Sequence, residues 1–422
     1  MSNISSRNPT EDSSTEPPET INRFTSYAEE IKEEMPEIDS EEEEEIELED
    51  PINAVVNNDA ETELEETVKQ LASMHPETPI ARGSRKWYEK EPSWKWKGKP
   101  LKNPISKEKI RICAITWNME GRPPPDDISS LFPPDVKHHL YIVCAEECMR
   151  SIGHSLFKTS KKDWETKVLA ALGREYSLLE ACTLTALHLA IYAHASVKPL
   201  ISFHESDKIS TGVANVIGNK GGVGISFKIG STKAMVIGCH LAAGHNAVTK
   251  RSNDLARIER ELSLPSYWPK SGLATDRTDF AIILGDLNYR IFGPKDAIEY
   301  LIEENAIETL KKYDQLRLEI EDRKIAQDFE EGEIRFPPTY RFDKGENRYD
   351  TSKKQRIPGW TDRILYKDRK GLAKQKSYDC IMSEKHSDHR PVFSQFVLKF
   401  RNDIVGPVNT RTNKGSSTCV TF

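Results

Sequence analysis

An acidic and an amide side chain follow directly on a short apolar run in the stretch AIILGDLNYR, residues 281–290. The run 280–284 predicts a buried strand that ends at Gly285. Asp286 and Asn288 are two positions apart, so their side chains point to the same side if both continue the strand. Such a pair could deprotonate and orient a water molecule, although Asp-x-Asn after a glycine is also typical of a plain turn. Other polar clusters favour the chemical interpretation.

Candidate metal ligands follow two other apolar runs. TWNMEG at 116–121 contains Asn118, a candidate neutral oxygen ligand or phosphate contact, although a lone asparagine after a strand is usually a turn residue. YIVCA at 141–145 is followed by Glu146 and Glu147. A carboxylate at the end of a buried strand is costly unless it is paired or bound to a cation. Mg²⁺ needs only one or two protein carboxylates beside water and phosphate. A single glutamate therefore suffices, and we expect Glu146 to face solvent.

Two clusters suggest phosphate contacts. GNKGGVG at 218–224 lacks the spacing of a P-loop or of a dinucleotide fingerprint, so its glycines chiefly allow a sharp turn. Asn219 and Lys220 could in addition reach a phosphate. CHLAAGH places His240 at the end of an apolar run, where an isolated histidine is commonly structural.

Two late motifs carry the most weight. QRIPGWTDRILY contains Asp362 and Arg363, and KHSDHRPVF contains Asp388 and His389. Apolar residues flank both motifs, so their polar groups lie near the core and require partners. An Asp–His pair fixes the imidazole tautomer and favours its protonated form. A protonated histidine stabilises negative charge on a phosphoryl group.

The elements that must position these groups are short, β-rich runs bounded by Gly, Asn or Pro. They predict strands at 110–117, 140–145, 187–193, 222–229, 233–239, 280–285 and 391–399. Helical periodicity predicts helices at 250–263 and 295–304. Strands interspersed with helices indicate an α/β domain, residues 107–401, in which helices cover sheets.

The flanking segments differ in composition. Residues 1–80 contain 24 Asp and Glu but only 4 Lys and Arg, a net charge of −20, and the whole chain carries −7, so the remainder carries +13. We expect residues 1–80 to be disordered, with a short helix allowed at 61–72, and residues 402–422 to be a flexible tail. A basic domain indicates an anionic substrate, nucleic acid or an anionic membrane surface.

The lead-in segment 81–106 mixes tryptophans with lysines at 85–98, and we expect these aromatic residues to pack on the domain rather than contact lipid. The seven cysteines show no paired spacing, which predicts a reducing intracellular compartment. No signal peptide and no apolar run of about 18 residues is visible.

Taken together, the motifs resemble those of the inositol polyphosphate 5-phosphatases, part of a wider superfamily of metal-dependent exonucleases, endonucleases and phosphatases. They occur over 107–400 in the family's order: TWN, EE, GNKGGV, HLAAGH, GDLNYR, YDQL, PPTYRFD, KKQRIPGWTDRIL and SDHRPV. GDLN and SDH alone indicate the superfamily, whereas YDQL and the stretch 333–366 are typical of the 5-phosphatases. The resemblance implies a four-layer α/β/β/α sandwich of two mixed, largely antiparallel sheets, with the site at one edge.

The resemblance also implies a role for each motif residue. Glu147 would be the principal Mg²⁺ ligand with Asn118 beside it, and Asp286 would be the general base on a water that Asn288 orients. The other groups at the scissile phosphate would be His389 held by Asp362, Asp388 and His240. The neighbouring 4-phosphate would be bound by Tyr340, Arg341, Lys354 and Arg356. Three cations and a phenol suit a phosphate better than a base edge.

The departures from the family pattern are modest. Glu146 stands where Gln is usual, which adds a negative charge near the metal. Gly244 looks like an insertion in the HLAAH motif, Ser252 replaces an arginine, and Arg341 stands where Lys is commoner. None removes a group that catalysis needs.

We therefore expect a Mg²⁺-dependent phosphatase that acts on the 5-phosphate of phosphatidylinositol 4,5-bisphosphate, the 3,4,5-trisphosphate or soluble inositol polyphosphates. The terminal CVTF matches a CaaX pattern and predicts geranylgeranylation of Cys419. With the basic domain, this lipid would hold a cytoplasmic, monomeric enzyme on the cytosolic face of membranes. The alternatives are a nuclease or abasic endonuclease on the same skeleton, and an inactive prenylated phosphoinositide-binding adaptor. The phosphate-gripping cluster disfavours nucleic acid as a partner.

Overall fold

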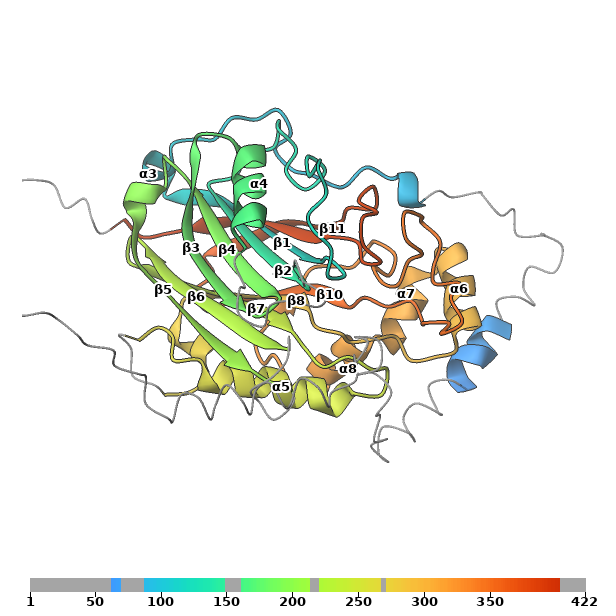
Figure 1. Cartoon of the computed structure of the whole chain (residues 1–422). Coiled ribbons are helices and arrows are strands. Elements are labelled where there is room, and N and C mark those ends of the chain that lie inside the picture. The colour runs from blue at the N-terminus through green and yellow to red at the C-terminus, as the bar shows by residue number, and fades with distance from the viewer. Residues whose placement is uncertain (1–61, 70–86, 149–160, 213–219, 267–270, 403–422) are drawn as a thin grey trace, which may run out of the picture. The chain divides into compact units, whose positions relative to one another are not determined.

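Two six-stranded sheets pack against each other in a computed structural model of the chain (Figure 1). It describes residues 62–69, 87–148, 161–212, 220–266 and 271–402, which all belong to the unit Glu49–Phe422. Sheet A has the strand order β11-β12-β1-β2-β4-β3, and sheet B has the order β5-β6-β7-β8-β10-β9. β1 pairs with β2, and β7 with β8, in parallel, while the other pairs are antiparallel. The predicted pair of mixed, largely antiparallel sheets is confirmed.

The strands of sheet A are β1 (Lys109–Asn118), β2 (Leu140–Glu146), β3 (Tyr176–Leu184), β4 (Leu187–His194), β11 (Ala373–Cys380) and β12 (Val392–Lys399). Those of sheet B are β5 (Ile201–Ser210), β6 (Gly221–Ile229), β7 (Thr232–His240), β8 (Phe280–Asp286), β9 (Glu330–Glu331) and β10 (Asp362–Asp368). All seven predicted strands are present within about two residues. The sequence prediction missed β3, β5, β9, β10 and β11, which are edge strands or carry charged residues that interrupt the apolar pattern.

Helices cover the outer faces of both sheets. α4 (Lys162–Leu172) buries Trp164, Val168 and Leu172 in the apolar cluster on the outer side of sheet A. α5 (Val248–Glu261) packs on the outer side of sheet B through Leu255 and Ile258. These four layers confirm the α/β/β/α sandwich. The predicted helix at 295–304 is α6 (Lys295–Glu303), and α3 (Pro104–Lys107), α7 (Ile307–Leu310) and α8 (Gln315–Glu321) are additional short helices.

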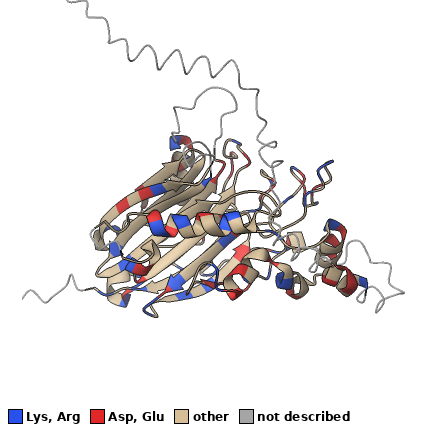
Figure 2. Ribbon diagram, turned by 90° about the horizontal axis from the view of Figure 1, so that it is seen from below, with Lys and Arg blue, Asp and Glu red and all other residues tan. Residues whose placement is uncertain are grey.

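Charged residues of both signs occur along α5, as the ribbon in Figure 2 shows. Arg251, Asp254 and Glu259 among them are buried, whereas Lys250, Arg260 and Glu261 are exposed.

Part of the N-terminal region packs on the domain. Residues 62–69 form a helix, and Leu64 in it is fully buried in the main core cluster. The expectation of disorder therefore fails at these eight residues, where the helix allowed by the 61–72 pattern forms instead. In the lead-in segment Trp94 stacks on Phe393 with ring centroids 3.8 Å apart, so packing on the domain is confirmed for Trp94.

Within the described residues no helix is both long and apolar enough to cross a membrane.

A buried ion-pair network joins β10 to the loops beyond sheet B. The fully buried Arg363 donates to both carboxylate oxygens of Asp314, each at 2.9 Å, and to Glu331 at 2.6 and 2.7 Å. Asp314 is also the N-cap of α8, where it accepts from the backbone N–H of Arg317. One guanidinium thus fixes β9, β10 and the start of α8.

We expect Arg363→Met to lower the free energy of unfolding by about 3–5 kcal/mol, because it leaves the buried Asp314 and the partly buried Glu331 without their cation. Urea unfolding followed by fluorescence measures this loss. The matched control is Arg317→Met, which removes an exposed pair with Glu321 and should cost less than about 1 kcal/mol. A small loss for Arg363→Met would show that this network does not stabilise the domain.

Candidate active site

The ends of strands from both sheets meet at one edge of the sandwich. In sheet B, Asp286 at the end of β8 lies opposite His240 of β7 and Asp362 of β10 in the strand register. In sheet A, Asn118 at the end of β1 lies opposite Glu146 of β2. Residues that are paired across neighbouring strands point to the same face. Hydrogen bonding therefore places polar groups from distant motifs beside one another.

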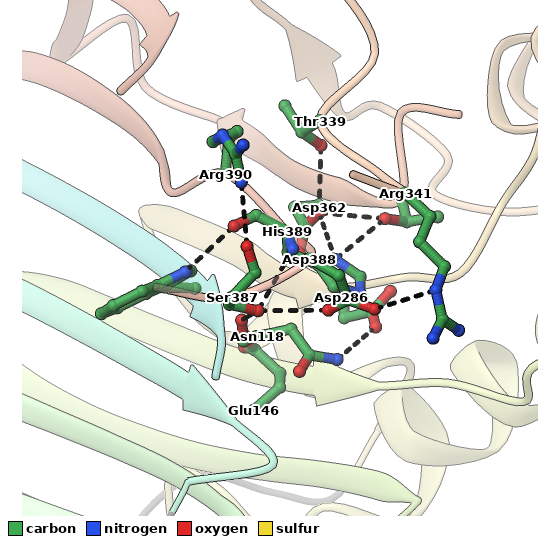
Figure 3. Close-up of polar contacts among 12 residues, drawn as sticks. Asn118, Glu146, Asp286, Thr339, Arg341, Asp362, Ser387, Asp388, His389 and Arg390 are labelled. Carbon is green, nitrogen blue, oxygen red and sulfur yellow. Dashed lines mark hydrogen bonds and ion pairs between the residues drawn. The ribbon is translucent and has the colours of Figure 1, made fainter. Parts of the chain in front are cut away.

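Asp286 is the centre of this cluster. It is 2% exposed and accepts from Asn118 Nδ2 at 2.9 Å, a contact that spans the two sheets (Figure 3). Its other oxygen accepts from the backbone N–H of Asn288 at 3.0 Å. Burial opposes the charge on Asp286, but a hydrogen bond from His240 and the nearby charges of His389, His240 and Lys220 hold its pKa well below the usual range. The carboxylate is therefore ionised at neutral pH.

The GDLN turn owes its shape to two residues. Gly285 has φ of +145°, and a Cβ there would lie 1.9 Å from the carbonyl oxygen of Cys239, so only glycine fits between β7 and β8. Asn288 adopts φ of 58°, which asparagine tolerates. Its amide donates to Leu241 O at 3.1 Å and accepts from Arg290 at 2.7 Å. The GDLN segment therefore forms a turn and also places Asp286 and Asn288 in the site.

His389 and Asp362 form the predicted pair. Asp362 Oδ2 lies 2.9 Å from His389 Nδ1 and also accepts from the hydroxyls of Thr339 and Thr361 (Figure 3). Burial lowers the pKa of His389, but the charge and hydrogen bond of Asp362 outweigh it and raise the pKa to about 10. The imidazole is thus protonated at neutral pH and presents a buried positive charge.

His240 sits between Asp286 and the glycine-rich segment. It is fully buried, and its Nε2 lies 2.7 Å from Lys220 Nζ, 3.5 Å from Asp286 and 3.9 Å from Glu147. Burial and the charge of Lys220 lower the pKa of His240. The hydrogen bond and charge of Asp286 and the charge of Glu147 act in the opposite direction, so His240 connects the lysine to the carboxylates. Lys220 therefore belongs to the site, whereas its neighbour Asn219 lies outside the described residues.

Glu146 corrects one sequence-based expectation. Its side chain is fully buried rather than facing solvent, and one oxygen accepts from Thr116 Oγ1 at 2.9 Å. Burial, aided by the charges of Asp362 and Asp286, raises the pKa of Glu146 to about 8. It is Glu147 that is partly exposed, with a quarter of its side chain accessible. Every residue of β2 is buried, so the apolar run gave no signal of which face is inward.

A protonated Glu146 makes stability depend on pH. Its folded-state pKa of about 8 lies above the unfolded value of about 4.3, so the free energy of unfolding should fall as pH rises from 5 to 8. We expect Glu146→Gln to flatten this slope, because the amide cannot ionise. Thermal unfolding from pH 5 to 8 in EDTA measures it, with the exposed Glu175→Gln as control. Parallel slopes for wild type and Glu146→Gln would contradict a buried, protonated Glu146.

The acidic groups suit a hard divalent cation. Asp286, Asp362 and His389 have ligand atoms within 4.8 Å of one another. Among the described residues, Asp362 Oδ1 and Glu146 Oε2 are buried without a hydrogen-bond partner. Carboxylate and amide oxygens are the ligands that Mg²⁺ and Ca²⁺ prefer. Burial opposes charge on Glu147, but the charges of His240, Lys220 and His389 keep its pKa below the usual range. The carboxylates present therefore fit a hard divalent cation.

The loop 339–359 borders the cluster with cationic side chains. Tyr340 lies against His389 with ring centroids 4.6 Å apart. Arg341 Nε lies 3.3 Å from Asp388 Oδ2 (Figure 3). Lys354 is exposed and Arg356 is partly buried, further along the same loop. The structure thus brings Tyr340, Arg341 and Asp388 into the cluster, whereas a contribution of Lys354 and Arg356, in the far part of the same loop, stays a prediction.

Several supporting residues escaped the sequence analysis. Arg290 binds the side chain of Asn288 and lies over the ring of Tyr340 at 4.4 Å. Thr339 and Thr361 hold Asp362, and Ser387 donates to Asn118 O at 2.7 Å. Each is next to or within two residues of a predicted site residue, which was the only available signal. Cys419 lies outside the described residues, and its prenylation stays a prediction that mass spectrometry can test.

Comparisons with known proteins agree with this geometry. Residues 115–395 match the endonuclease/exonuclease/phosphatase family 2. The chain is 32% identical over 307 residues to phosphatidylinositol polyphosphate 5-phosphatase type IV of Mus musculus, covering 69% of this chain and 46% of that protein. It is 34% identical over 305 residues to type II inositol 1,4,5-trisphosphate 5-phosphatase of Mus musculus, covering 70% and 30%. The chain thus spans less than half the length of these relatives.

Solved structures of other proteins are similar to this chain in fold. The inositol polyphosphate 5-phosphatase domain of SPsynaptojanin, in complex with inositol (1,4)-bisphosphate and calcium ion, is 30% identical with a TM-score of 0.62, covering 69% of this chain and 85% of that one. A Cimex nitrophorin, 21% identical with a TM-score of 0.56, covers 69% and 99% and shares the fold alone. The chain therefore belongs to the endonuclease/exonuclease/phosphatase family 2 and, within it, to the inositol polyphosphate 5-phosphatases.

Proposed function

We propose that this protein is a Mg²⁺-dependent phosphatase that hydrolyses the 5-phosphate of phosphoinositides and soluble inositol polyphosphates. The observation that carries the proposal is the contact of Asn118 from sheet A with Asp286 from sheet B, beside the buried His389–Asp362 pair. An ionised base, an amide and a buried cation converge on one point, as attack of water on a phosphate monoester requires.

Each side chain has a distinct task in this reaction. Asp286 takes a proton from the attacking water, and Asn288 and Asn118 orient the nucleophile and the carboxylate. The imidazolium of His389 stabilises the negative charge that develops on the phosphoryl oxygens, and Lys220 adds a second positive charge through its contact with His240. A cation held by Glu147 and Asn118 would supply further charge neutralisation of the phosphate.

The substrate class follows from the cationic loop. Tyr340, Arg341, Lys354 and Arg356 would bind the ring phosphate next to the scissile one, which a simple phosphate monoester lacks. The basic domain and the lipid substrates named for the relatives support action at the cytosolic face of membranes, and we propose that the protein acts there as a monomer.

Phosphate release tests this function. The substrates are phosphatidylinositol 4,5-bisphosphate and 3,4,5-trisphosphate in vesicles and soluble inositol 1,4,5-trisphosphate, each with Mg²⁺ and with EDTA. We expect release that requires Mg²⁺ from at least one of them, and the ratio of rates defines the preferred class. If none of the three substrates releases phosphate and the protein cleaves an abasic DNA duplex, the protein is a nuclease and the proposal is wrong. Binding to phosphoinositide vesicles without phosphate release would replace it with an adaptor.

A further inference from the structure

Two parts of the N-terminal region contact the elements that support the 339–359 loop. This loop contains Tyr340, Arg341, Lys354 and Arg356, the residues proposed to bind the second phosphate. These parts are the helix 62–69 and the 3₁₀ turn Trp87–Glu89. Both precede the domain defined by the family match, which begins at residue 115. Figure 1 shows the helix beside α6. Their contacts point to a role for this region in the site itself.

The first contact is made by Leu64. Its side chain is fully buried over Gly293, where an added Cβ would lie 2.2 Å from Leu64 Cδ2. Gly293 is two residues before α6, whose first residue is Lys295. Lys295 Nζ donates to Asp350 O at 2.7 Å and to Gln355 Oε1 at 2.9 Å. Leu64 thus packs on the base of an element that holds the far end of the 339–359 loop.

That end of the loop is organised around Asp350. Its carboxylate accepts from the backbone N–H of Ser352 at 2.9 Å and from that of Arg356 at 2.7 Å. Its own N–H donates to Arg341 O at 3.0 Å. The backbone of Arg341 and that of Arg356 therefore depend on one residue, which Lys295 fixes from α6.

The second contact is made by Trp87. Its ring stacks on Tyr349 with centroids 6.0 Å apart and an interplanar angle of 28°, and lies 6.3 Å from Phe342. Phe342 and Tyr349 face each other across the two arms of the loop, with ring centroids 4.5 Å apart, and form a β-bridge. Trp87 therefore covers the pair that holds the two arms together.

We propose that Leu64 and Trp87 are positioning residues: by packing on Gly293 and on the Phe342–Tyr349 pair, they hold the cations of the 339–359 loop in place for the ring phosphate next to the scissile one. This inference rests on the proposed function for its substrate, but its structural part stands without it. The N-terminal segment thereby sets the affinity for substrates that carry this second phosphate, and leaves the reaction at the 5-phosphate unchanged.

The kinetic test compares two soluble substrates in the full-length protein. Inositol 1,4,5-trisphosphate carries the 4-phosphate, whereas inositol 1,5-bisphosphate lacks it. For Trp87→Ala we expect KM for the trisphosphate to rise about five- to tenfold, since an aromatic contact of this kind is lost, with kcat within about twofold of wild type. KM for the bisphosphate should not change. Leu64→Ala should have the same effect in the same direction.

Matched controls separate positioning from general stability. Trp87→Phe keeps a stacked ring and should restore most of the wild-type KM, and the exposed neighbours Lys90→Ala and Glu65→Ala should leave both substrates unaffected. A variant that merely unfolds in part would lose kcat on both substrates equally and keep its KM. Equal losses of that kind, or an unchanged KM in a folded Trp87→Ala protein, would overturn the proposal.

Hydrogen exchange tests the bracing independently of activity. We expect the amides of 342–356 to exchange at least threefold faster in Trp87→Ala and in Leu64→Ala than in wild type, with strand β8 unchanged. Unchanged exchange in this loop would refute the bracing even if wild type proved inactive on every inositol phosphate. Faster exchange with an inactive wild type would keep the bracing and refute the proposed function.

Discussion

Asp286→Asn should lower kcat by about 10²- to 10⁴-fold, the size of effect expected when a general base is lost. The amide keeps the size of the carboxylate and can still accept from Asn288 N–H, so the fold should survive. It cannot take a proton from water, and it brings a donor toward Asn118 Nδ2, which now donates to Asp286 at 2.9 Å. Single-turnover phosphate release with saturating substrate measures the chemical step.

The matched control is Asp279→Asn, the same substitution just before the opposite end of β8. Asp279 accepts from the backbone N–H of Lys233 at 3.0 Å, far along the strand from the site. We expect Asp279→Asn to retain nearly full activity, and both variants to unfold at temperatures close to wild type. Near-normal turnover in Asp286→Asn would remove Asp286 from its assigned role as base.

Asp362→Asn should move the alkaline limb of the pH–rate profile to lower pH by about 1–3 units. The pKa of His389 is raised to about 10, so wild type keeps its imidazolium across neutral pH and loses activity only as pH approaches 10. Without the Asp362 charge, burial dominates and the pKa of His389 falls. The variant should therefore retain a larger share of wild-type activity at pH 6 than at pH 8.

The profile of kcat/KM from pH 5 to 10.5 measures this shift, and His389→Ala provides the control in which no imidazole titrates. The stabilisation of the fold by the His389–Asp362 pair also decreases at alkaline pH. Because the folded pKa of His389 lies above the unfolded value, the pair's stabilisation is complete below about pH 6.5 and disappears as pH rises through about 10. A profile of unchanged shape and reduced height in Asp362→Asn would show that Asp362 does not set the charge of His389.

The chemical groups of the site could be predicted from local sequence. Apolar runs such as 280–284 are short, β-rich and followed at once by polar residues, so both the strand and its functional end were visible in one stretch. The order of the motifs also fixed the family and, through it, the two-sheet fold. Strands β3, β5 and β11 escaped because half-exposed or edge strands carry charges that hide their periodicity.

The orientation of individual side chains depended on tertiary structure. The sequence placed Glu146 and Glu147 side by side but did not tell which one enters the core, because β2 is buried on both faces and only the packing of sheet A on sheet B separates them. Leu64 looked like part of an acidic, disordered tail, yet it is buried because Gly293, some 230 residues later, leaves room for it. Local patterns determine which residues form strands and which groups end them. Contacts between residues far apart in the chain decide which of these groups meet, and they are specified only when the complete core has packed.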